Sequence, residues 1–260
     1  MKTPLVSLRR VSVSYDGHDA LKEVDLDIYP DDFLGIIGPN GGGKTTLVKA
    51  IVGTIPYRGT ISYSPQLFRG KERLIGYMPQ QSIFDRSFPI SVLEVVMSGL
   101  QGQRGFHARY ASGDRAKAQE LLRTAGIDGI ARKPIGEISG GQMQRALLCR
   151  AVISDPKLLI LDEPANFVDN RFENELYRML AELHGRMAIV MISHDLGTIT
   201  SVVRNIVCVN RYVHRHDSNI ITEELRNYDC PIQLISHGKV PHTVLALHPH
   251  DCCPHTRTEE

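Results

Sequence analysis

Eight consecutive residues, Gly38 to Thr45, combine four glycines with a lysine and a threonine. They match the pattern G-x-x-x-x-G-K-[ST], after an apolar run and before a helix-like pattern. Glycines let successive backbone N–H groups point at phosphate oxygens, and a helix N-terminus adds a favourable dipole. Lys44 is expected to reach the β- and γ-phosphates, and the Thr45 hydroxyl to bind Mg²⁺. The residues expected to hold the nucleotide here are Gly38, Pro39, Asn40, Gly41, Gly42, Gly43, Lys44, Thr45 and Thr46.

Two later apolar runs also end in polar residues that could act on a phosphate. The run 158–161 leads into Asp162 and Glu163, and the run 188–192 leads into Ser193 and His194. Ligands of open α/β sheets collect where parallel strands end. Asp162 is therefore expected to hold Mg²⁺ and Glu163 to polarise the attacking water as general base. His194 could donate to the γ-phosphate, although a lone histidine is more often a surface or capping residue.

Hydrophobic periodicity predicts the elements that must position these groups. Alternating apolar and polar residues indicate half-buried strands, continuous apolar runs indicate buried strands, and apolar residues three or four apart indicate helices. Strand patterns occupy 11–15, 24–28, 33–37, 58–63, 73–78, 158–161 and 187–192, and helical patterns occupy 44–52, most of 89–138, 140–153 and 171–183. The alternation predicts an α/β fold with a mainly parallel sheet. An antiparallel pair joined near Asp16 and the helical block are expected to form subdomains.

Composition excludes several other classes of protein. The 260 residues are 42% hydrophobic and 23% charged, which is ordinary for a folded globular chain. The formal net charge of +1 provides no field to attract nucleic acid, so no nucleic-acid partner is expected. No apolar run approaches the length of a membrane-spanning helix, and the start has no signal-peptide core. Five scattered cysteines fit a reducing cytoplasm better than a disulfide framework.

The segment Ile138-Ser139-Gly140-Gly141-Gln142 resembles the defining LSGGQ motif of ABC ATPases, with isoleucine in its first place. A glycine-rich helix start is by itself another anion site. In that family the motif closes over a nucleotide held by the phosphate loop of a second subunit. The resemblance therefore implies a P-loop NTPase of ABC type, an ATPase that works as a head-to-tail homodimer with ATP and Mg²⁺. Ser139, Gly140, Gly141 and Gln142 are expected to contact the partner's nucleotide.

Other family elements follow in the family's order, over roughly residues 5–210. Tyr15 is similar to the aromatic residue that stacks on adenine, although a half-buried strand tyrosine would show the same pattern. Gln80 resembles the glutamine that contacts Mg²⁺ and the attacking water, with Gln81 as the alternative. Asp169 occupies the place of an acid in the loop between subunits, where Asn166-Phe167-Val168 replaces the usual Ser-Ala-Leu. His194 matches the family's switch histidine.

Short segments around Tyr77-Met78-Pro79-Gln80 and 88–96 resemble the subgroup that serves importers of zinc, manganese or iron. The resemblance implies an integral membrane permease and an extracytoplasmic metal-binding protein as partners, with zinc the expected cargo. It places the chain in the cytoplasm, peripheral on the inner face of the cell membrane. The alternatives are the ATPase of an exporter or lipoprotein-release system, or a non-transport ABC protein such as an iron–sulfur assembly scaffold.

The tail adds a possible second metal site. It gathers His250, Cys252, Cys253 and His255, and thiol with imidazole is a ligand set that zinc prefers. A terminus carrying these residues by chance is the simpler alternative, and neighbouring prolines discourage a preformed cage. We therefore expect an ABC ATPase domain over 1–210, with a helical subdomain at about 89–140, and a C-terminal extension over 211–260.

Overall fold

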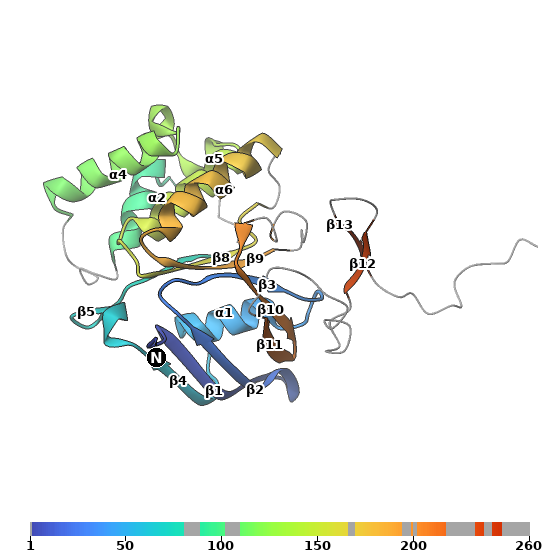
Figure 1. Ribbon diagram of the computed structural model, residues 1–260. Helices are drawn as coiled ribbons and strands as arrows, with labels where there is room; N and C mark the ends of the chain where they lie inside the picture. Colours follow the sequence, from blue (N-terminus) through green and yellow to red (C-terminus); the bar gives the residue numbers. More distant parts are fainter. Residues whose placement is uncertain are drawn as a thin grey trace, which may run out of the picture.

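The computed structural model describes residues 2–80, 89–101, 110–165, 170–193, 199, 202–216, 232–236 and 241–245 (Figure 1). Its strands are β1 Val6–Tyr15, β2 His18–Ile28, β3 Phe33–Ile37, β4 Arg58–Tyr63, β5 Phe68–Arg69, β6 Glu72–Arg73, β7 Ile75–Met78, β8 Leu158–Asp162, β9 Ala188–Ile192, β10 Asn205–Asn210, β11 Tyr212–His216, β12 Ile232–Ser236 and β13 Pro241–Leu245. Its α-helices are α1 Lys44–Val52, α2 Val92–Met97, α4 Ser112–Thr124, α5 Gly140–Val152 and α6 Asn170–His184. Its 3₁₀ turns are η1 Pro65–Leu67, η2 Ser98–Leu100, η3 Asp128–Ile130 and η4 Ile135–Glu137.

A six-stranded sheet in the order β11-β10-β3-β9-β8-β7 forms the centre of the described chain. Its strands are parallel except for β11, which pairs antiparallel with β10 at one edge. Strands β3, β8 and β9 are buried along their whole length, as continuous apolar runs predict for a sheet covered on both faces. The prediction of a mainly parallel sheet is confirmed. The predicted strand at 73–78 is shorter, because Arg73 belongs to the β5–β6 hairpin and β7 begins at Ile75.

Helices cover the two faces of this sheet unequally (Figure 1). On one face, α2, α4, α5 and α6 form a hydrophobic cluster with the β3 and β8 side chains that point to that face, including Phe33, Leu159 and Leu161. On the other face, α1 lies between the six-stranded sheet and a second, three-stranded sheet, and buries Leu47 and Ile51. All described helices are too short or too polar to cross a bilayer.

The second sheet has the order β2-β1-β4 and is antiparallel throughout. The Asp16-Gly17 turn joins its first two strands, with both residues at positive φ (49° and 81°). Such a turn follows the right-handed twist of the strands, which is why the sequence signal was informative. The predicted antiparallel hairpin at 11–28 is confirmed, and both strands extend further than their alternation indicated.

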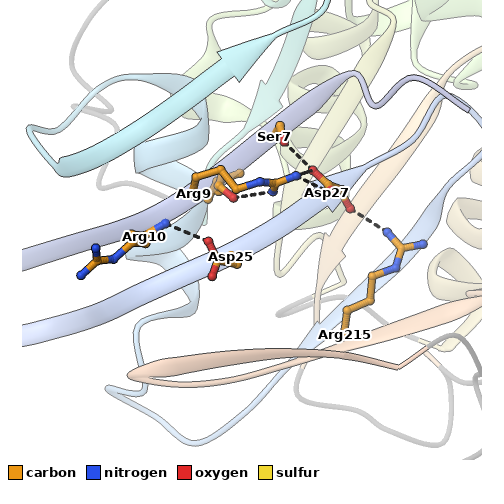
Figure 2. A network of polar contacts seen from close by, with 7 residues as sticks. Ser7, Arg9, Arg10, Asp25, Asp27 and Arg215 are labelled. Atoms are coloured by element: carbon orange, nitrogen blue, oxygen red, sulfur yellow. Dashed lines mark hydrogen bonds and ion pairs between the residues drawn. The ribbon is translucent and has the colours of Figure 1, made fainter. Parts of the chain in front are cut away.

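A polar network joins the two sheets at β11 (Figure 2). Arg215 of β11 forms a bidentate pair with Asp32, with both nitrogen–oxygen distances 2.9 Å, and donates to the Asp27 carbonyl at 2.7 Å. Asp27 of β2 in turn accepts two hydrogen bonds from Arg9 of β1, each 2.9 Å long. Bidentate guanidinium–carboxylate pairs add geometric specificity as well as energy. The network therefore attaches the first strand beyond residue 210 to the β1–β2 hairpin.

Candidate nucleotide site

The Gly38–Thr45 loop connects β3 to α1, the arrangement that a phosphate loop requires. Gly38 has a φ of 149°, and a Cβ at this position would lie 2.0 Å from the Val209 carbonyl oxygen. Gly43 has a φ of 100°, and its Cβ would lie 2.5 Å from the Ala20 carbonyl oxygen. Only glycine tolerates such close backbone approach together with these dihedrals. The loop is therefore held between β10 and β2 before any ligand binds.

Lys44 begins α1 and is only 6% exposed. Its Nζ donates to the carbonyl oxygens of Gly38 and Pro39, both at 2.9 Å, so the ammonium group spans the loop from within. Burial lowers the pKa of Lys44, while the negative charges of Glu163 and Asp162 act to raise it. A lysine held against loop carbonyls beside two acids can exchange those weak partners for phosphate oxygens.

Asp162 ends β8 and is 1% exposed, and neither of its carboxylate oxygens has a hydrogen-bond partner among the described residues. Burial raises the pKa of Asp162, and the nearby Thr45 hydroxyl opposes that shift. A buried carboxylate with unsatisfied oxygens is costly unless a cation or a water compensates it. Aspartate and threonine oxygens at one edge of a sheet match the hard oxygen ligands of Mg²⁺. The residues present therefore fit a magnesium ion.

Glu163 follows Asp162 and is 8% exposed. Its backbone has a φ of 53°, and its N–H donates to the Ile192 carbonyl of β9 at 3.1 Å. Gln80, 83 positions earlier and just past β7, donates from Nε2 to Glu163 Oε2 at 2.6 Å. A non-glycine residue in the left-handed region marks backbone strain, which functional sites commonly contain. The strained turn and the glutamine hold the carboxylate at the mouth of the loop.

Lys44, Gln80 and Glu163 line one cleft of about 610 Å³, and Asp162, Gly38 and Pro39 are not part of its described lining. Tyr15 stands at its rim, 47% exposed at the end of β1, where a nucleobase could stack on the ring. The described lining comprises Tyr15, Ala20, Asn40, Gly41, Gly42, Gly43, Lys44, Thr45, Thr46, Gln80 and Glu163. The structure thus brings together most of the residues that the sequence predicts for nucleotide binding.

The Ser139–Gln142 segment lies elsewhere and does not line this cleft. Ser139 caps α5: its Oγ accepts from the Gln142 N–H at 3.3 Å, and Gln142 Oε1 accepts from the Ser139 N–H at 3.1 Å. Ser139 and Gly140 are both exposed. This helix start therefore faces outward, and the N-terminus of a helix is favourable for an anion.

The family of the chain follows from comparison with known proteins. A family model described as ABC transporter matches residues 21–166, more than half of the chain. The chain belongs to this family. The matched stretch includes the phosphate loop, the Ser139–Gln142 segment and the Asp162–Glu163 pair, and the chain is accordingly the ATP-binding, ATP-hydrolysing subunit of such a transporter.

Curated relatives include the zinc import ATP-binding proteins ZnuC of Pseudomonas entomophila and Pseudomonas putida. They are 40% and 39% identical to this ABC subunit over 217 residues, which is 82% of this chain and 77% of each relative. An inward-facing structure described as a metal-chelate type ABC transporter has a TM-score of 0.77 at 25% identity, covering 94% of this chain and 98% of that one. A dimeric ATP-binding cassette bound to ADP and phosphate has a TM-score of 0.71 at 22% identity, covering 84% and 100%, and supports the fold alone.

Three sets of predicted residues lie outside the described part of this ABC subunit. They are the switch histidine His194, the loop acid Asp169, and the tail residues His250, Cys252, Cys253 and His255. Among the described residues no group of three or more His, Cys, Asp or Glu side chains could hold a metal ion. The roles predicted for these residues stay predictions.

Sequence reasoning missed two residues whose backbone packs against the phosphate loop, and a tyrosine near Asp162 that lies outside the described lining of the cleft. Ala20 and Val209 contribute the carbonyl oxygens against which the loop glycines pack, and backbone contacts of this kind leave no signal in side-chain types. Tyr77 of β7 pairs in register with Ile160, two residues before Asp162. Burial, followed by the Asp162 charge, raises the pKa of the Tyr77 hydroxyl to about 12. The alternating pattern of β7 could have placed Tyr77 on the face that Asp162 shares.

Proposed function

We propose that this ABC subunit hydrolyses ATP with Mg²⁺ to power zinc import through a separate membrane permease. The observation that carries the proposal is the 40% identity, over 82% of the chain, to a zinc import ATP-binding protein. The exporter, lipoprotein-release and assembly-scaffold alternatives are not favoured by any of the relatives described above. The division into an ATPase domain over 1–210, with its helical part at about 89–140, and an extension over 211–260 belongs to the same proposal.

The residues of the cleft and the adjoining Asp162 would each have a separate role in hydrolysis. Lys44 would balance charge on the β- and γ-phosphates, and the loop N–H groups from Gly41 to Thr46 would cradle their oxygens. Asp162 and Thr45, with Gln80, would hold the magnesium ion, whose chemical contribution is to neutralise developing charge on the phosphates. Glu163, held at 2.6 Å by Gln80, would orient and deprotonate the attacking water. Tyr15 would stack on the adenine at the rim of the cleft.

Two copies of the chain would complete each site. The nucleotide cleft and the helix start at Ser139 and Gly140 are separate, and the helix start is exposed. A head-to-tail homodimer would bring the Ser139–Gln142 segment of one copy over the nucleotide of the other, and Asp169 and His194 would act at that junction. Closure on ATP and opening after hydrolysis would then supply the movement.

The remaining partners follow from an import role. The permease would hold the ABC dimer on the inner face of the membrane, and an extracytoplasmic metal-binding protein would deliver zinc to the permease. The zinc would be cargo and would never enter the nucleotide cleft. The tail site with His250, Cys252, Cys253 and His255 would sense zinc and restrain the motor.

Metal uptake by whole cells tests the proposal. Cells lacking this subunit would be compared with cells restored with wild type or with Glu163→Gln, and zinc, manganese and iron would be followed together. The expected result is that zinc uptake is lost and is restored by wild type but not by Glu163→Gln. Unchanged uptake of all three metals would overturn the import role and direct attention to exporters. Loss of manganese or iron uptake alone would overturn zinc as the cargo.

A further inference from the structure

Tyr77 of β7 carries a buried hydroxyl that takes no part in the proposed hydrolysis. The hydroxyl oxygen is shielded from solvent and has no hydrogen-bond partner among the described residues. A buried hydroxyl without a partner lowers the stability of a fold. Native structures retain few such groups, and those that remain commonly serve a site or pair with a bound water or ion.

The pairing of β7 with β8 places Tyr77 beside Asp162. Tyr77 lies opposite Ile160 in the parallel register, and Asp162 is two positions further along β8. Residues two apart on a strand point to the same face, so Tyr77 and Asp162 share a face. Ile160 is part of the hydrophobic cluster that includes Leu47 of α1, and Tyr77 packs against this cluster. Adjacent strands lie about 4.8 Å apart and rise about 3.3 Å per residue, which puts the α-carbons of Tyr77 and Asp162 about 8 Å apart, within reach of an aromatic side chain.

Asp162 lacks the kind of partner that Tyr77 can provide. It is 1% exposed, and both of its carboxylate oxygens are without a hydrogen-bond partner in the described part of the chain. Burial, and after it the negative charge of Asp162, raises the pKa of the Tyr77 hydroxyl to about 12, so the two groups act on each other. The hydroxyl keeps its proton at neutral pH and can donate it to a carboxylate. A buried donor and a buried acceptor, both unpaired among the described residues, thus lie on one face of the sheet.

A single buried water can join these two groups. Tyr77 and Asp162 form no direct hydrogen bond with each other. Buried waters make about three hydrogen bonds, to polar groups that otherwise have no partner. A water between the two would accept from the Tyr77 hydroxyl and donate to Asp162, and such a bridge is enthalpically nearly as good as a direct hydrogen bond.

Tyr63 of β4 shows how a tyrosine beside the same cluster is satisfied without an acid. Its hydroxyl donates to the Ile51 carbonyl oxygen of α1 at 2.8 Å, and its side chain packs against the same hydrophobic cluster. Tyr63 and Tyr77 are both half-buried strand residues, and they differ in what their hydroxyls meet. Tyr63 is therefore a matched control for Tyr77.

A hydrogen bond from Tyr77 would make β7 the support of both acids in the site. Gln80, just past the end of β7, donates to Glu163 at 2.6 Å, and Tyr77 would donate to the preceding residue, Asp162. Carboxylates that bind metals are commonly hydrogen-bonded by further residues, and loss of such a residue weakens metal affinity. The hydrogen bond would oppose rotation of the Asp162 carboxylate away from Thr45.

We propose that Tyr77 is a positioning residue for Asp162: its hydroxyl donates through one water to the carboxylate and fixes the orientation in which Asp162 holds Mg²⁺. The inference rests on the proposed function, which gives Asp162 its role as a magnesium ligand. Tyr77 should therefore affect the affinity for the metal and leave binding of the nucleotide itself unchanged. The groups proposed to bind the nucleotide are Lys44, the loop N–H groups and Tyr15, and none of them depends on the Tyr77 hydroxyl.

Metal affinity tests the proposal, with Mn²⁺ as the probe because it shares the preference of Mg²⁺ for octahedral oxygen ligands. Wild type, Tyr77→Phe and the control Tyr63→Phe would be mixed with a non-hydrolysable ATP analogue, and free Mn²⁺ would be measured by electron paramagnetic resonance. We expect Tyr77→Phe to bind Mn²⁺ roughly tenfold to a hundredfold more weakly than wild type, as loss of a hydrogen bond to a metal ligand does. Tyr63→Phe should bind Mn²⁺ like wild type. With EDTA in place of Mn²⁺, all three proteins should bind a fluorescent ATP analogue equally.

The outcomes separate the role of Tyr77 from the proposed function. Equal Mn²⁺ affinity in wild type and Tyr77→Phe, both above that of the free analogue, would overturn the role of Tyr77 and leave the proposed function intact. Wild type that binds Mn²⁺ no more tightly than the free analogue would overturn Asp162 as a metal ligand, and the inference with it. An equal loss of analogue affinity in EDTA, or an equal loss of Mn²⁺ affinity in Tyr63→Phe, would refute the proposal by assigning the effect to a distorted fold.

Unfolding in urea, without nucleotide or metal, provides a second test. In the wild-type background, Tyr77→Phe should raise the equilibrium constant of unfolding about fivefold, because a hydrogen bond of ordinary strength is lost. In an Asp162→Ala background the same change should leave this constant unchanged or lower it, because the hydroxyl no longer has its acceptor. An equal change in both backgrounds, in either direction, would show that the hydroxyl does not pair with Asp162 and would refute the proposal.

Discussion

The starts of α1 and α5 are both rich in glycine, yet their surroundings differ. At α1, Gly38 and Gly43 press against carbonyl oxygens of distant strands, and Lys44 is buried with two carbonyl partners. At α5, Ser139 and Gly140 are exposed, and the cap hydrogen bonds run only between Ser139 and Gln142. The first site is built by the whole fold and the second by one turn of helix.

In the proposed homodimer, this difference would divide one active site between two copies of the chain. A loop that must bind a multiply charged ligand tightly is preorganised, because its donors then need no rearrangement at the moment of reaction. A segment that must approach and leave with each cycle stays at the surface, where opening exposes no core. Variants at both helix starts test this comparison.

The largest effect is expected at Glu163, on the preorganised side. Glu163→Gln removes the proposed base and should lower the rate of hydrolysis about 10²- to 10⁴-fold, while ATP still binds through Lys44 and the loop. Phosphate release and binding of a fluorescent ATP analogue would be measured. The control is Glu182→Gln, an exposed glutamate of α6. A rate within a few-fold of wild type would refute the assignment of Glu163 as base.

At the α5 start, Ser139→Ala should lower hydrolysis on the order of 10²-fold, because the partner's nucleotide loses one donor. ATP binding by the isolated subunit should not change. The free energy of unfolding should also fall by about 1 kcal/mol, since the cap is lost.

Ser91→Ala provides the matched control for this loss of a cap. Ser91 caps α2 with the same reciprocal arrangement, to Glu94, and lies outside the cleft lining. It should lose similar stability in urea unfolding and keep its hydrolysis rate. Equal loss of hydrolysis in both variants would show that Ser139 acts only as a cap.

Preorganisation of the phosphate loop predicts an effect on stability. Gly38→Ala would force a Cβ to within 2.0 Å of the Val209 carbonyl oxygen, and the free energy of unfolding should fall by about 3 kcal/mol. Gly41 has a φ of 76°, but a Cβ added there would lie in open space. Gly41→Ala should therefore lower the free energy of unfolding by only about 1 kcal/mol. Urea denaturation of both variants checks the contrast. Equal losses in the free energy of unfolding would mean that the positive φ, and not the contact with β10, accounts for the cost of an added Cβ in this loop.

The smallest effect is expected at the rim. Tyr15 is 47% exposed, so its ring contributes little to the fold and is available to a base. Tyr15→Ala should weaken ATP binding roughly tenfold, as loss of one aromatic stacking partner does, and Tyr15→Phe should bind like wild type. Titration with a fluorescent ATP analogue measures both. Unchanged affinity in Tyr15→Ala would leave Tyr15 as a strand residue without a role in binding.

Much of the fold could be predicted from the chain because its signals are local. The alternation around Asp16, the apolar runs at β3, β8 and β9, and the helix after Ser139 all appear in the structure where periodicity indicated. Region 211–216 could not be interpreted, because β11 is an edge strand with partly exposed polar residues and little periodicity. Its position depends on Arg215 and Asp32, which are 183 positions apart.

The chemistry of this protein can be predicted from its residue types and their spacing: a phosphate loop, two acids after a strand, and a second glycine-rich helix start. Residue type and spacing carry that information, since a lysine or a carboxylate has its character wherever the chain places it. The tertiary structure alone decided which groups meet. It placed Gln80 against Glu163, the loop glycines against Ala20 and Val209, and Arg150 against Ser98. Contacts between distant residues depend on packing of the whole chain, and no local pattern records them.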